Sequence, residues 1–119
     1  MPTIEEKIQA VITALEDIKA TNITVLETSK LSSLFDRMVI ASANTPRQTR
    51  ALADHLTKQL KLREIPVLST EGEGSGEWVL VDLGEIVVHI MQPAVRAYYN
   101  LEELWNMKHI PASPAHGAK

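Results

Sequence analysis

Apolar side chains recur at intervals of three or four residues through the first part of the chain. The repeating positions are Ile4, Ile8, Val11, Ile12, Leu15 and Ile18. This spacing places them on one side of an α-helix, so residues 4–20 are predicted to form an amphipathic helix. Thr3 and Glu6 have the spacing of a capping box, in which each side chain accepts a hydrogen bond from the other residue's backbone amide.

A second amphipathic helix is predicted to begin at Pro46, with Thr45 as its N-cap. Proline suits the first helical position because the amide there has no partner within the helix. The predicted inward positions are Leu52, Leu56 and Leu60, and the cations near the helix end are Lys58, Lys61 and Arg63. Positive charge at that end is favourable beside the negative end of the helix dipole.

A third helix is predicted from Pro93 to about Lys108. Helical spacing puts one stripe of side chains on its core face: Ala94, Tyr98, Leu101 and Trp105. Tyr99 lies well away from this stripe. We therefore expect Tyr98 and Trp105 in the core and Tyr99 on the surface.

Five shorter apolar or β-branched runs are predicted to be strands. They are residues 23–27, 35–41, 65–68, 78–81 and 86–91. Pro66 indicates an edge position or a strand start for the third run. The predicted order is α-β-β-α-β-β-β-α. Because these strands are too closely spaced for a purely parallel sheet, we expect an α/β fold with helices packed on a mixed sheet.

The last two strands are predicted to form a β-hairpin whose turn spans residues 82–85, where Gly84 can adopt a positive φ. Leu83 lies at the tip of this turn. It either projects as an exposed apolar contact or folds back onto the core, and spacing does not decide between the two. Alternation places Val79 and Val81 on one face and Trp78, Leu80 and Asp82 on the other. The charge of Asp82 indicates that the second face is partly open.

The length of 119 residues suits one domain. We place that domain at residues 1–108 and predict a disordered tail at 109–119, which is rich in Pro, Ala and Gly. The chain has no cysteine, no signal-like start and no apolar run of about 20 residues. These features predict a soluble cytoplasmic protein with no membrane partner.

Charge is distributed unevenly. Between Arg63 and Arg96 there is no Lys or Arg but there are six acidic side chains, so this region carries −6 and the rest of the chain +3. Nucleic-acid backbones are bound by clustered cations, so a charged partner of this region is expected to be basic. The alternative is a solvated acidic face that serves solubility.

The candidate chemistry argues against an enzyme. The Gly-rich residues 72–76 precede a strand rather than a helix and are interleaved with glutamates, which disfavours phosphate binding. The histidines show no metal-binding spacing, and the carboxylates show no Asp-x-Asp pair for Mg²⁺. His89 is either a buried, hydrogen-bonded side chain or a polar group on the exposed face. We expect no catalytic residue, cofactor or metal.

What remains is a surface combining Trp78, Asp82, Leu83 and Tyr99. An aromatic and aliphatic centre with an acidic rim is typical of a protein–protein interface.

The most distinctive residues of the chain fall into two sets. The downstream set is Glu71-Gly72, residues 77–91, Arg96, Tyr99, Leu101-Glu102 and Leu104-Trp105, and the upstream set is Asp36, residues 39–41, Arg47-Gln48 and Ala53-Asp54. Over roughly residues 4–105 they resemble the ribosomal silencing factor family, also called Iojap-like. The sequence departs from that pattern at Ser42-Ala43, where a glycine is expected, and after Trp105.

This resemblance implies a protein that binds the large ribosomal subunit through its fourteenth protein and blocks joining with the small subunit, which represses translation when nutrients are scarce. It also implies a nucleotidyltransferase-like fold without catalytic carboxylates. The family's partner contacts match Trp78, Leu83 and Tyr99, and the resemblance also implies partner contacts by Asp82 and Met91. No direct contact with nucleic acid is required.

Two alternatives to ribosome binding remain open from the sequence. One is nucleotide binding or nucleotidyl transfer, which would rest on fold analogy alone. The other is a homodimerisation module, since homodimers occur in the family.

Overall fold

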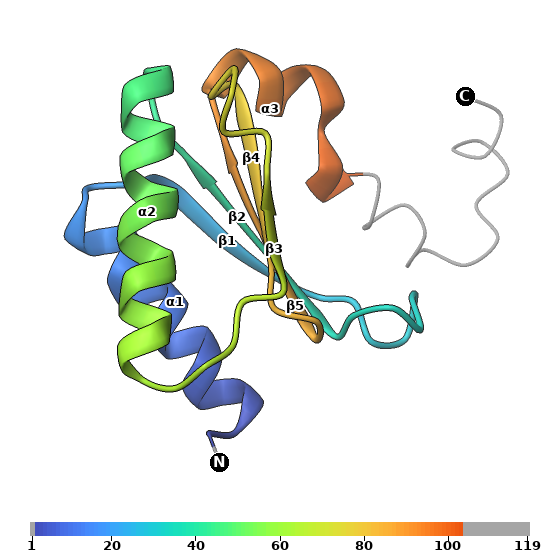
Figure 1. Ribbon diagram of the computed structural model, residues 1–119. Helices are drawn as coiled ribbons and strands as arrows, with labels where there is room; N and C mark the ends of the chain where they lie inside the picture. The colour runs from blue at the N-terminus through green and yellow to red at the C-terminus, as the bar shows by residue number, and fades with distance from the viewer. Residues whose placement is uncertain (1, 104–119) are drawn as a thin grey trace, which may run out of the picture.

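The structure is a computed structural model that describes residues 2–103. Its elements are α1 (Ile4–Asp17), β1 (Thr21–Glu27), β2 (Arg37–Ser42), α2 (Pro46–Leu62), β3 (Ser69–Glu71), β4 (Trp78–Asp82), β5 (Ile86–Met91) and α3 (Pro93–Tyr99). The predicted order of elements and the mixed α/β class are confirmed (Figure 1). The nucleotidyltransferase-like classification stays a prediction.

The five strands form a single sheet in the order β1-β2-β5-β4-β3. The central strands β2 and β5 are parallel, and every other neighbouring pair is antiparallel. The β4–β5 pair is the predicted hairpin, with Trp78 opposite Met91 and Asp82 opposite Val87. This register fixes which side chains of the hairpin share a face.

Both predicted N-terminal caps are present. The Thr3 hydroxyl accepts from the Glu6 amide (3.1 Å), and the Glu6 carboxylate accepts from the Thr3 amide (2.7 Å). The Thr45 hydroxyl caps α2 by accepting from the Gln48 amide (3.0 Å), with Pro46 at the first helical position. Helix α1 ends at Asp17 rather than near Ala20, because Lys19 adopts a left-handed conformation (φ 63°) that a continuing helix does not allow.

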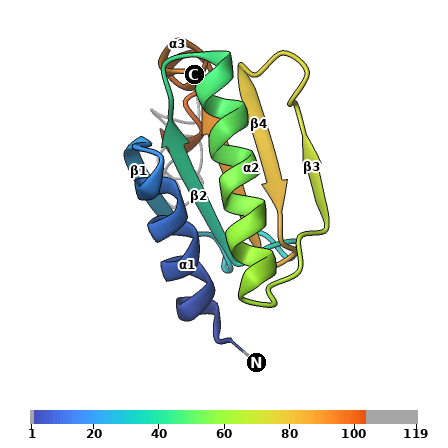
Figure 2. The same cartoon turned by 60° about the vertical axis from the view of Figure 1, so that its left-hand side comes forward.

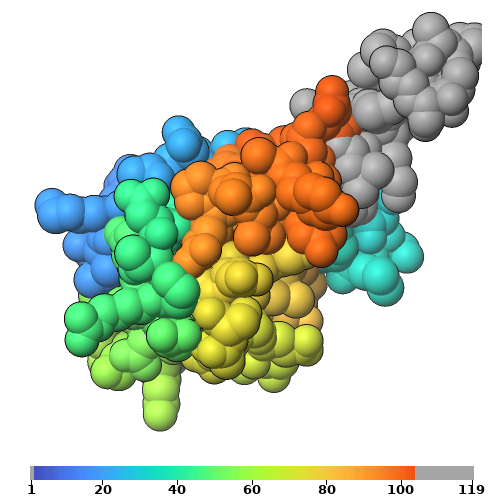
Figure 3. Space-filling model, turned by 90° about the horizontal axis from the view of Figure 1, so that it is seen from above, coloured from blue at the N-terminus to red at the C-terminus, as the bar shows by residue number. Residues whose placement is uncertain are grey.

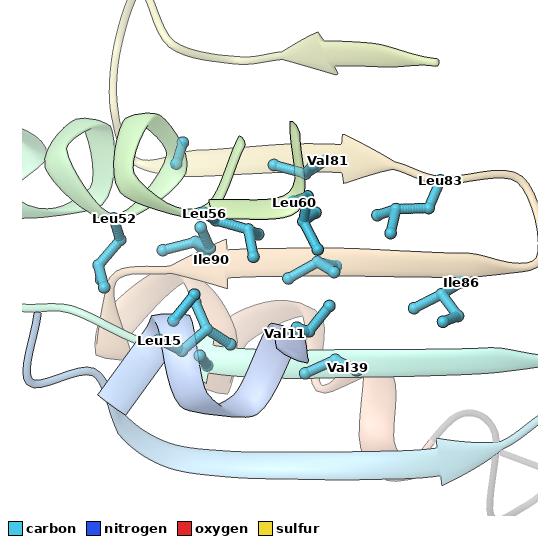
Figure 4. Close-up of a cluster of buried hydrophobic side chains, with 14 of the residues drawn as sticks. Val11, Leu15, Val39, Leu52, Leu56, Leu60, Val81, Leu83, Ile86 and Ile90 are labelled. Carbon is cyan, nitrogen blue, oxygen red and sulfur yellow. The ribbon is translucent and has the colours of Figure 1, made fainter. Parts of the chain in front are cut away.

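Helices α1 and α2 cover one face of the sheet (Figure 2). The core lies between these helices and the sheet. Figure 4 shows Leu15 from α1 and Leu52, Leu56 and Leu60 from α2 directed toward the strands. The three predicted inward leucines of α2 are all completely buried. The opposite face carries a second apolar cluster, of Met38, Ile40 and Met91 with Leu26, Phe35, Trp78, Val95 and Leu101.

The predicted strand at residues 65–68 is wrong. The amide of Ile65 donates back to the carbonyl oxygen of Leu60 (2.8 Å), which closes the end of α2, and Pro66 has no amide to offer a sheet. Sheet-like hydrogen bonding begins with the Leu68 amide, which donates to Asp82 (2.7 Å). The strand that follows, β3, lies at the edge of the sheet.

The third helix is also interrupted. Helix α3 ends at Tyr99, and Asn100 adopts the left-handed conformation (φ 48°) before residues 101–103 become helical again. Tyr98 is 82% exposed, so its predicted core position is wrong. Ala94 is exposed as well, so the predicted stripe is wrong within α3 itself, where Val95 packs on the second apolar cluster. The turn at Asn100 then lets Leu101 pack there although Tyr98 does not. The predicted positions of Trp105, the helix end at Lys108 and the tail at 109–119 lie outside the described residues.

Candidate protein-interaction surface

The hairpin presents one buried and one partly open face. Val79 and Val81 are completely buried against the helices, whereas Trp78, Leu80 and Asp82 are partly exposed on the other side. The predicted alternation is therefore confirmed. The cause is the two-residue period of a strand in a sheet whose helices α1 and α2 lie on one face.

Three aromatic rings gather where this open face meets α3. The rings of Trp78 and Tyr99 are 4.8 Å apart between centroids, and those of Tyr99 and Tyr98 are 5.1 Å apart in an edge-on arrangement. Tyr99 is 53% exposed, and Tyr98 is more exposed still. We call these three residues the aromatic surface. Seen from above, α3 lies on the outside of the molecule beside the yellow segment that leads into β4 (Figure 3).

Tyr98 was missed by helical spacing. The predicted stripe joined Tyr98 to Leu101 through a continuous helix, whereas α3 packs through Val95 and the left-handed Asn100 separates Tyr98 from Leu101. Asn tolerates this conformation better than most residues, which was the available sequence signal. Both tyrosines are thus surface aromatics rather than Tyr99 alone.

His89 lies under the aromatic surface as a buried, hydrogen-bonded side chain. Its Nδ1 accepts a hydrogen bond from the indole Nε1–H of Trp78 (2.9 Å), and the residue is only 8% exposed. Burial lowers the pKa of His89 to about 4, so the imidazole is neutral at pH 7. The first of the two alternatives for His89 is therefore confirmed.

The stability of the protein is expected to depend on pH through His89. Its folded-state pKa of about 4 is below the ordinary 6.5, so the unfolded chain binds more protons between these values. The free energy of unfolding should be highest above pH 6.5 and fall by about 2 kcal/mol on going from pH 7.5 to pH 5. Urea titrations of wild type and His89→Asn at both pH values measure this. An equal decrease in the two proteins would contradict it, because all other titrating groups are shared.

Arg96 anchors α3 to the sheet. Its guanidinium donates to the carbonyl oxygen of Asn22 (2.6 Å), to the hydroxyls of Ser42 (2.8 Å) and Thr24 (3.0 Å), and to the Glu102 carboxylate (2.7 and 3.1 Å). The hydrogen bond from Arg96 lowers the pKa of the Glu102 carboxyl. These contacts join both sides of the Asn100 turn to β1 and β2. They hold the tyrosines in place and leave the positive charge of Arg96 neutralised.

Leu83 is not an exposed apolar tip. Its side chain is 8% exposed and packs in the core with Ile86 and Val81, on the side of the sheet that the helices cover (Figure 4). The one-residue alternation that exposes Asp82 turns Leu83 inward, and the Leu83 amide donates to Ile86 (2.9 Å) across the turn. The core alternative is thus confirmed, and direct contact with a partner would require the side chain to leave the core.

Met91 is also inside the protein. It is completely buried in the second apolar cluster, beneath Trp78 and beside Val95. The expectation that Met91 contacts a partner therefore conflicts with its position. The residue instead supports Trp78 from below, because the two are directly opposite each other on β4 and β5.

Asp82 stays on the open face and shapes the turn. Its carboxylate accepts from the amide of Gly84 (2.8 Å), and Gly84 has the positive φ (93°) that was predicted. The carboxylate is partly exposed. Asp82 thus combines a structural hydrogen bond with a negative charge on the open face, at the turn end of the hairpin.

The Gly-rich residues form a turn fixed against α2. The amide of Gly76 donates to Gly72 (3.1 Å), and the hydroxyl of Thr49 donates to the Gly76 carbonyl oxygen. A Cβ on Gly72, whose φ is 89°, would lie 2.1 Å from the carbonyl oxygen of Trp78. The segment therefore sets the start of β4 and the position of Trp78, and it leads into a strand, which is not the arrangement of a phosphate loop.

The acidic rim is smaller than charge counting indicated. Glu71, Glu73 and Glu77 are exposed around the start of β4. Glu85, by contrast, pairs with Lys7 of α1 at the other end of the hairpin. The rim consists of the three exposed glutamates, while Asp82 lies on the same open face at the turn end of the hairpin.

A hollow of about 230 Å³ lies beside Trp78 and is lined by Glu71, Gly72, Leu80 and His89. A larger hollow, of about 460 Å³, lies at the C-terminal end of α2 around Lys61 and Ile65, away from the aromatic surface. Within residues 2–103, no group of three or more His, Asp or Glu side chains is arranged to hold a metal. No helix in that part of the chain is long and apolar enough to cross a membrane.

Comparison with known proteins gives a consistent result. The family described as "Ribosomal silencing factor during starvation" matches residues 1–118. A ribosomal silencing factor from Chromobacterium violaceum is 51% identical over 102 residues, which are 86% of this chain and 84% of that protein. A crystal structure of a protein from the same organism superposes with a TM-score of 0.86 at 50% identity and covers 88% of each chain.

A more distant relative is the mouse protein named "Mitochondrial assembly of ribosomal large subunit protein 1". It is 32% identical over 104 residues, covering 85% of this chain and 46% of that protein. With a family match over nearly the whole sequence, close relatives of the same description and the same fold, the chain belongs to the ribosomal silencing factor family.

Proposed function

We propose that this protein binds the large ribosomal subunit through the aromatic surface and prevents the small subunit from joining. The observation that carries the proposal is the cluster of Trp78, Tyr98 and Tyr99 at the end of the sheet, with an acidic rim, in a chain of the ribosomal silencing factor family. Trp and Tyr are enriched among residues that dominate binding energy. Translation is thereby repressed under starvation, the condition named in the family's description.

The partner on the subunit is its fourteenth protein, as the family resemblance implies. The name of the mouse relative refers to the ribosomal large subunit and supports this choice of subunit. Binding at that protein places this chain next to the subunit interface, where its bulk excludes the small subunit. The site of action is then the cytoplasm, and no direct contact with ribosomal RNA is needed.

We assign different roles to the site residues. Trp78 and Tyr99 provide the apolar contact, and Tyr98 extends it at the most exposed position. Asp82 and the rim glutamates face the basic surface of the partner. Leu83 and Met91 act from inside the protein, by fixing the turn and by supporting the indole.

Asp82→Asn is expected to slow association with the large subunit by roughly two- to fivefold at low salt. The amide oxygen of Asn keeps the hydrogen bond with Gly84, so the change removes charge and not the turn. Stopped-flow association at low and high ionic strength measures the effect, which should shrink as salt screens it. Glu16→Gln, at an exposed position on α1, is the matched control. Equal rates for Asp82→Asn and wild type at low salt would contradict electrostatic steering.

Co-sedimentation with separated ribosomal subunits tests the binding step. We expect the protein to migrate with the large subunit and not with the small one. Competition by the purified fourteenth protein should release it. Migration with the small subunit, or no migration with either, would contradict the proposal.

Self-association is the second candidate, because an exposed apolar surface also suits a second copy of the chain. The exposed pair Tyr98 and Tyr99 is the observation that favours it. Analytical ultracentrifugation of wild type and Tyr98→Ala distinguishes the two. A dimer that depends on Tyr98 and competes with the ribosomal protein would make homodimerisation the main role of this surface.

A further inference from the structure

The orientation of Trp78 depends on a residue of the neighbouring strand. In the β4–β5 register Trp78 is opposite Met91, so His89 is its diagonal neighbour on the same face. The two rings are 5.7 Å apart between centroids and tilted by 44°. Their contact is polar as well as apolar, because the indole Nε1–H donates to Nδ1 of His89 at 2.9 Å.

This hydrogen bond determines the chemical form of His89. An indole N–H can only donate, so Nδ1 must carry a lone pair and the imidazole proton must be on Nε2. His89 is neutral in its buried setting, which is consistent with that tautomer. The pair therefore has a defined direction, from Trp78 to His89.

The same bond limits the rotation of the indole. A Trp side chain has two rotatable torsions, χ1 and χ2. The strand backbone fixes the direction of the Cα–Cβ bond about which χ1 turns. A hydrogen bond at Nε1, on the rim of the ring, restricts the second torsion. With that torsion set, the indole lies at 4.8 Å from the ring of Tyr99, between the buried imidazole and the exposed tyrosines.

We propose that His89 is a positioning residue for partner binding, since the hydrogen bond it accepts holds the Trp78 indole in the orientation that completes the aromatic surface. Nothing else in the described residues accepts from the indole N–H. A neutral acceptor at this point of β5 prepares the surface before binding, which lowers the entropy lost on association. The inference rests on the proposed function, because it concerns the affinity of that same surface.

Two variants separate the acceptor from the bulk of the side chain. The amide oxygen of His89→Asn is as many bonds from the backbone as Nδ1 and can replace it. His89→Leu retains comparable bulk but cannot accept. His89→Gln places its amide at the position of Nε2 instead, and it serves in place of His89→Leu should that variant not fold.

The first readout is the indole N–H resonance of Trp78 in heteronuclear NMR spectra, recorded in a Trp105→Phe background so that a single indole is observed. In the Trp105→Phe protein with His89 intact, and with His89→Asn added, we expect slow solvent exchange and a hydrogen-bonded chemical shift of the Trp78 indole N–H. In His89→Leu the signal should exchange faster and move toward the shift of free indole. An unchanged resonance in His89→Leu would overturn the inference.

The second readout is affinity for purified large ribosomal subunits, measured by co-sedimentation. His89→Leu should bind roughly three- to tenfold more weakly, the effect of one neutral hydrogen bond, and His89→Asn should bind within about twofold of wild type. Wild-type affinity in folded His89→Leu, or an equal loss of affinity in His89→Leu and His89→Asn, would overturn the role of His89 and leave the proposed function standing. If wild type itself did not bind, the proposed function would fail, and the inference with it.

Discussion

Trp78→Ala is expected to weaken binding to the large ribosomal subunit by about 30-fold or more. Removing a central aromatic residue from an interface costs about 2 kcal/mol or more, and each 1.4 kcal/mol corresponds to a factor of ten in affinity. Trp78 contacts Tyr99 and lies over Met91, so the truncation also removes the support on which the tyrosine ring rests. Quantitative co-sedimentation measures the loss.

The comparison of Trp78→Ala with wild type needs a control, because Trp78 is half-buried and its truncation also lowers the free energy of unfolding. Circular dichroism and urea titration establish the folded fraction to which each affinity refers. Leu62→Ala is the matched control, since Leu62 is 75% exposed at the end of α2, on an element away from the aromatic surface. Equal affinities for folded Trp78→Ala and Leu62→Ala would contradict the assignment of the aromatic surface as the binding site.

The second large effect concerns stability. Leu83→Ala should lower the free energy of unfolding by about 2–4 kcal/mol, because it removes a buried side chain and leaves a cavity between the hairpin and the helices. Leu83 packs with Val81 and Ile86 in the core cluster, which includes residues of α1 and α2. Urea titration monitored by circular dichroism gives this change directly.

Leu68→Ala is the control for Leu83→Ala. Leu68 is 66% exposed and lies beside the same turn, where a Cβ added to Gly84 would be 3.4 Å from the Leu68 side chain. Its truncation should cost less than about 1 kcal/mol, as is usual for surface positions. If Leu83→Ala had wild-type stability yet failed to bind the large subunit, Leu83 would act as a contact residue and its core role would be contradicted.

Elements with strong local signals were predictable from the sequence. Helix α2 has its Thr45 cap, Pro46 at the first position and leucines at helical spacing, and each of these agrees with the others. Strand β5 is an apolar run interrupted only by His89 and bounded by Gly84 and Pro93, and its predicted ends match the structure. The ends of such elements can be predicted from the residues at their boundaries.

The errors occurred where a tertiary contact or one backbone conformation outweighed local pattern. Residues 65–68 look like a strand, but the amide of Ile65 completes the end of α2. Helix α3 packs through Val95 rather than Ala94, and the left-handed Asn100 sets the direction of the residues that follow; helical spacing carries no information about either. Leu83 could point either way from a turn, and only packing against the core decides.

Only the part of the candidate site that follows from local pattern was predictable from the sequence. Alternation along the strand placed Trp78 and Asp82 together on the open face, and this required only the period of a strand. The bond between Trp78 and His89 depends on the register of the hairpin, which follows from the turn geometry. The anchoring of α3 by Arg96 joins residues more than 70 positions apart, and no local pattern contains it.

Subunit joining tests the central claim most directly. Purified large and small ribosomal subunits are mixed under conditions that favour joining, with and without excess protein, and separated on a sucrose gradient. The account predicts that the joined peak disappears when the wild-type protein is present, that the protein migrates with the large subunit, and that Trp78→Ala restores joining. A joined peak that persists while wild-type protein saturates the large subunit would contradict steric exclusion.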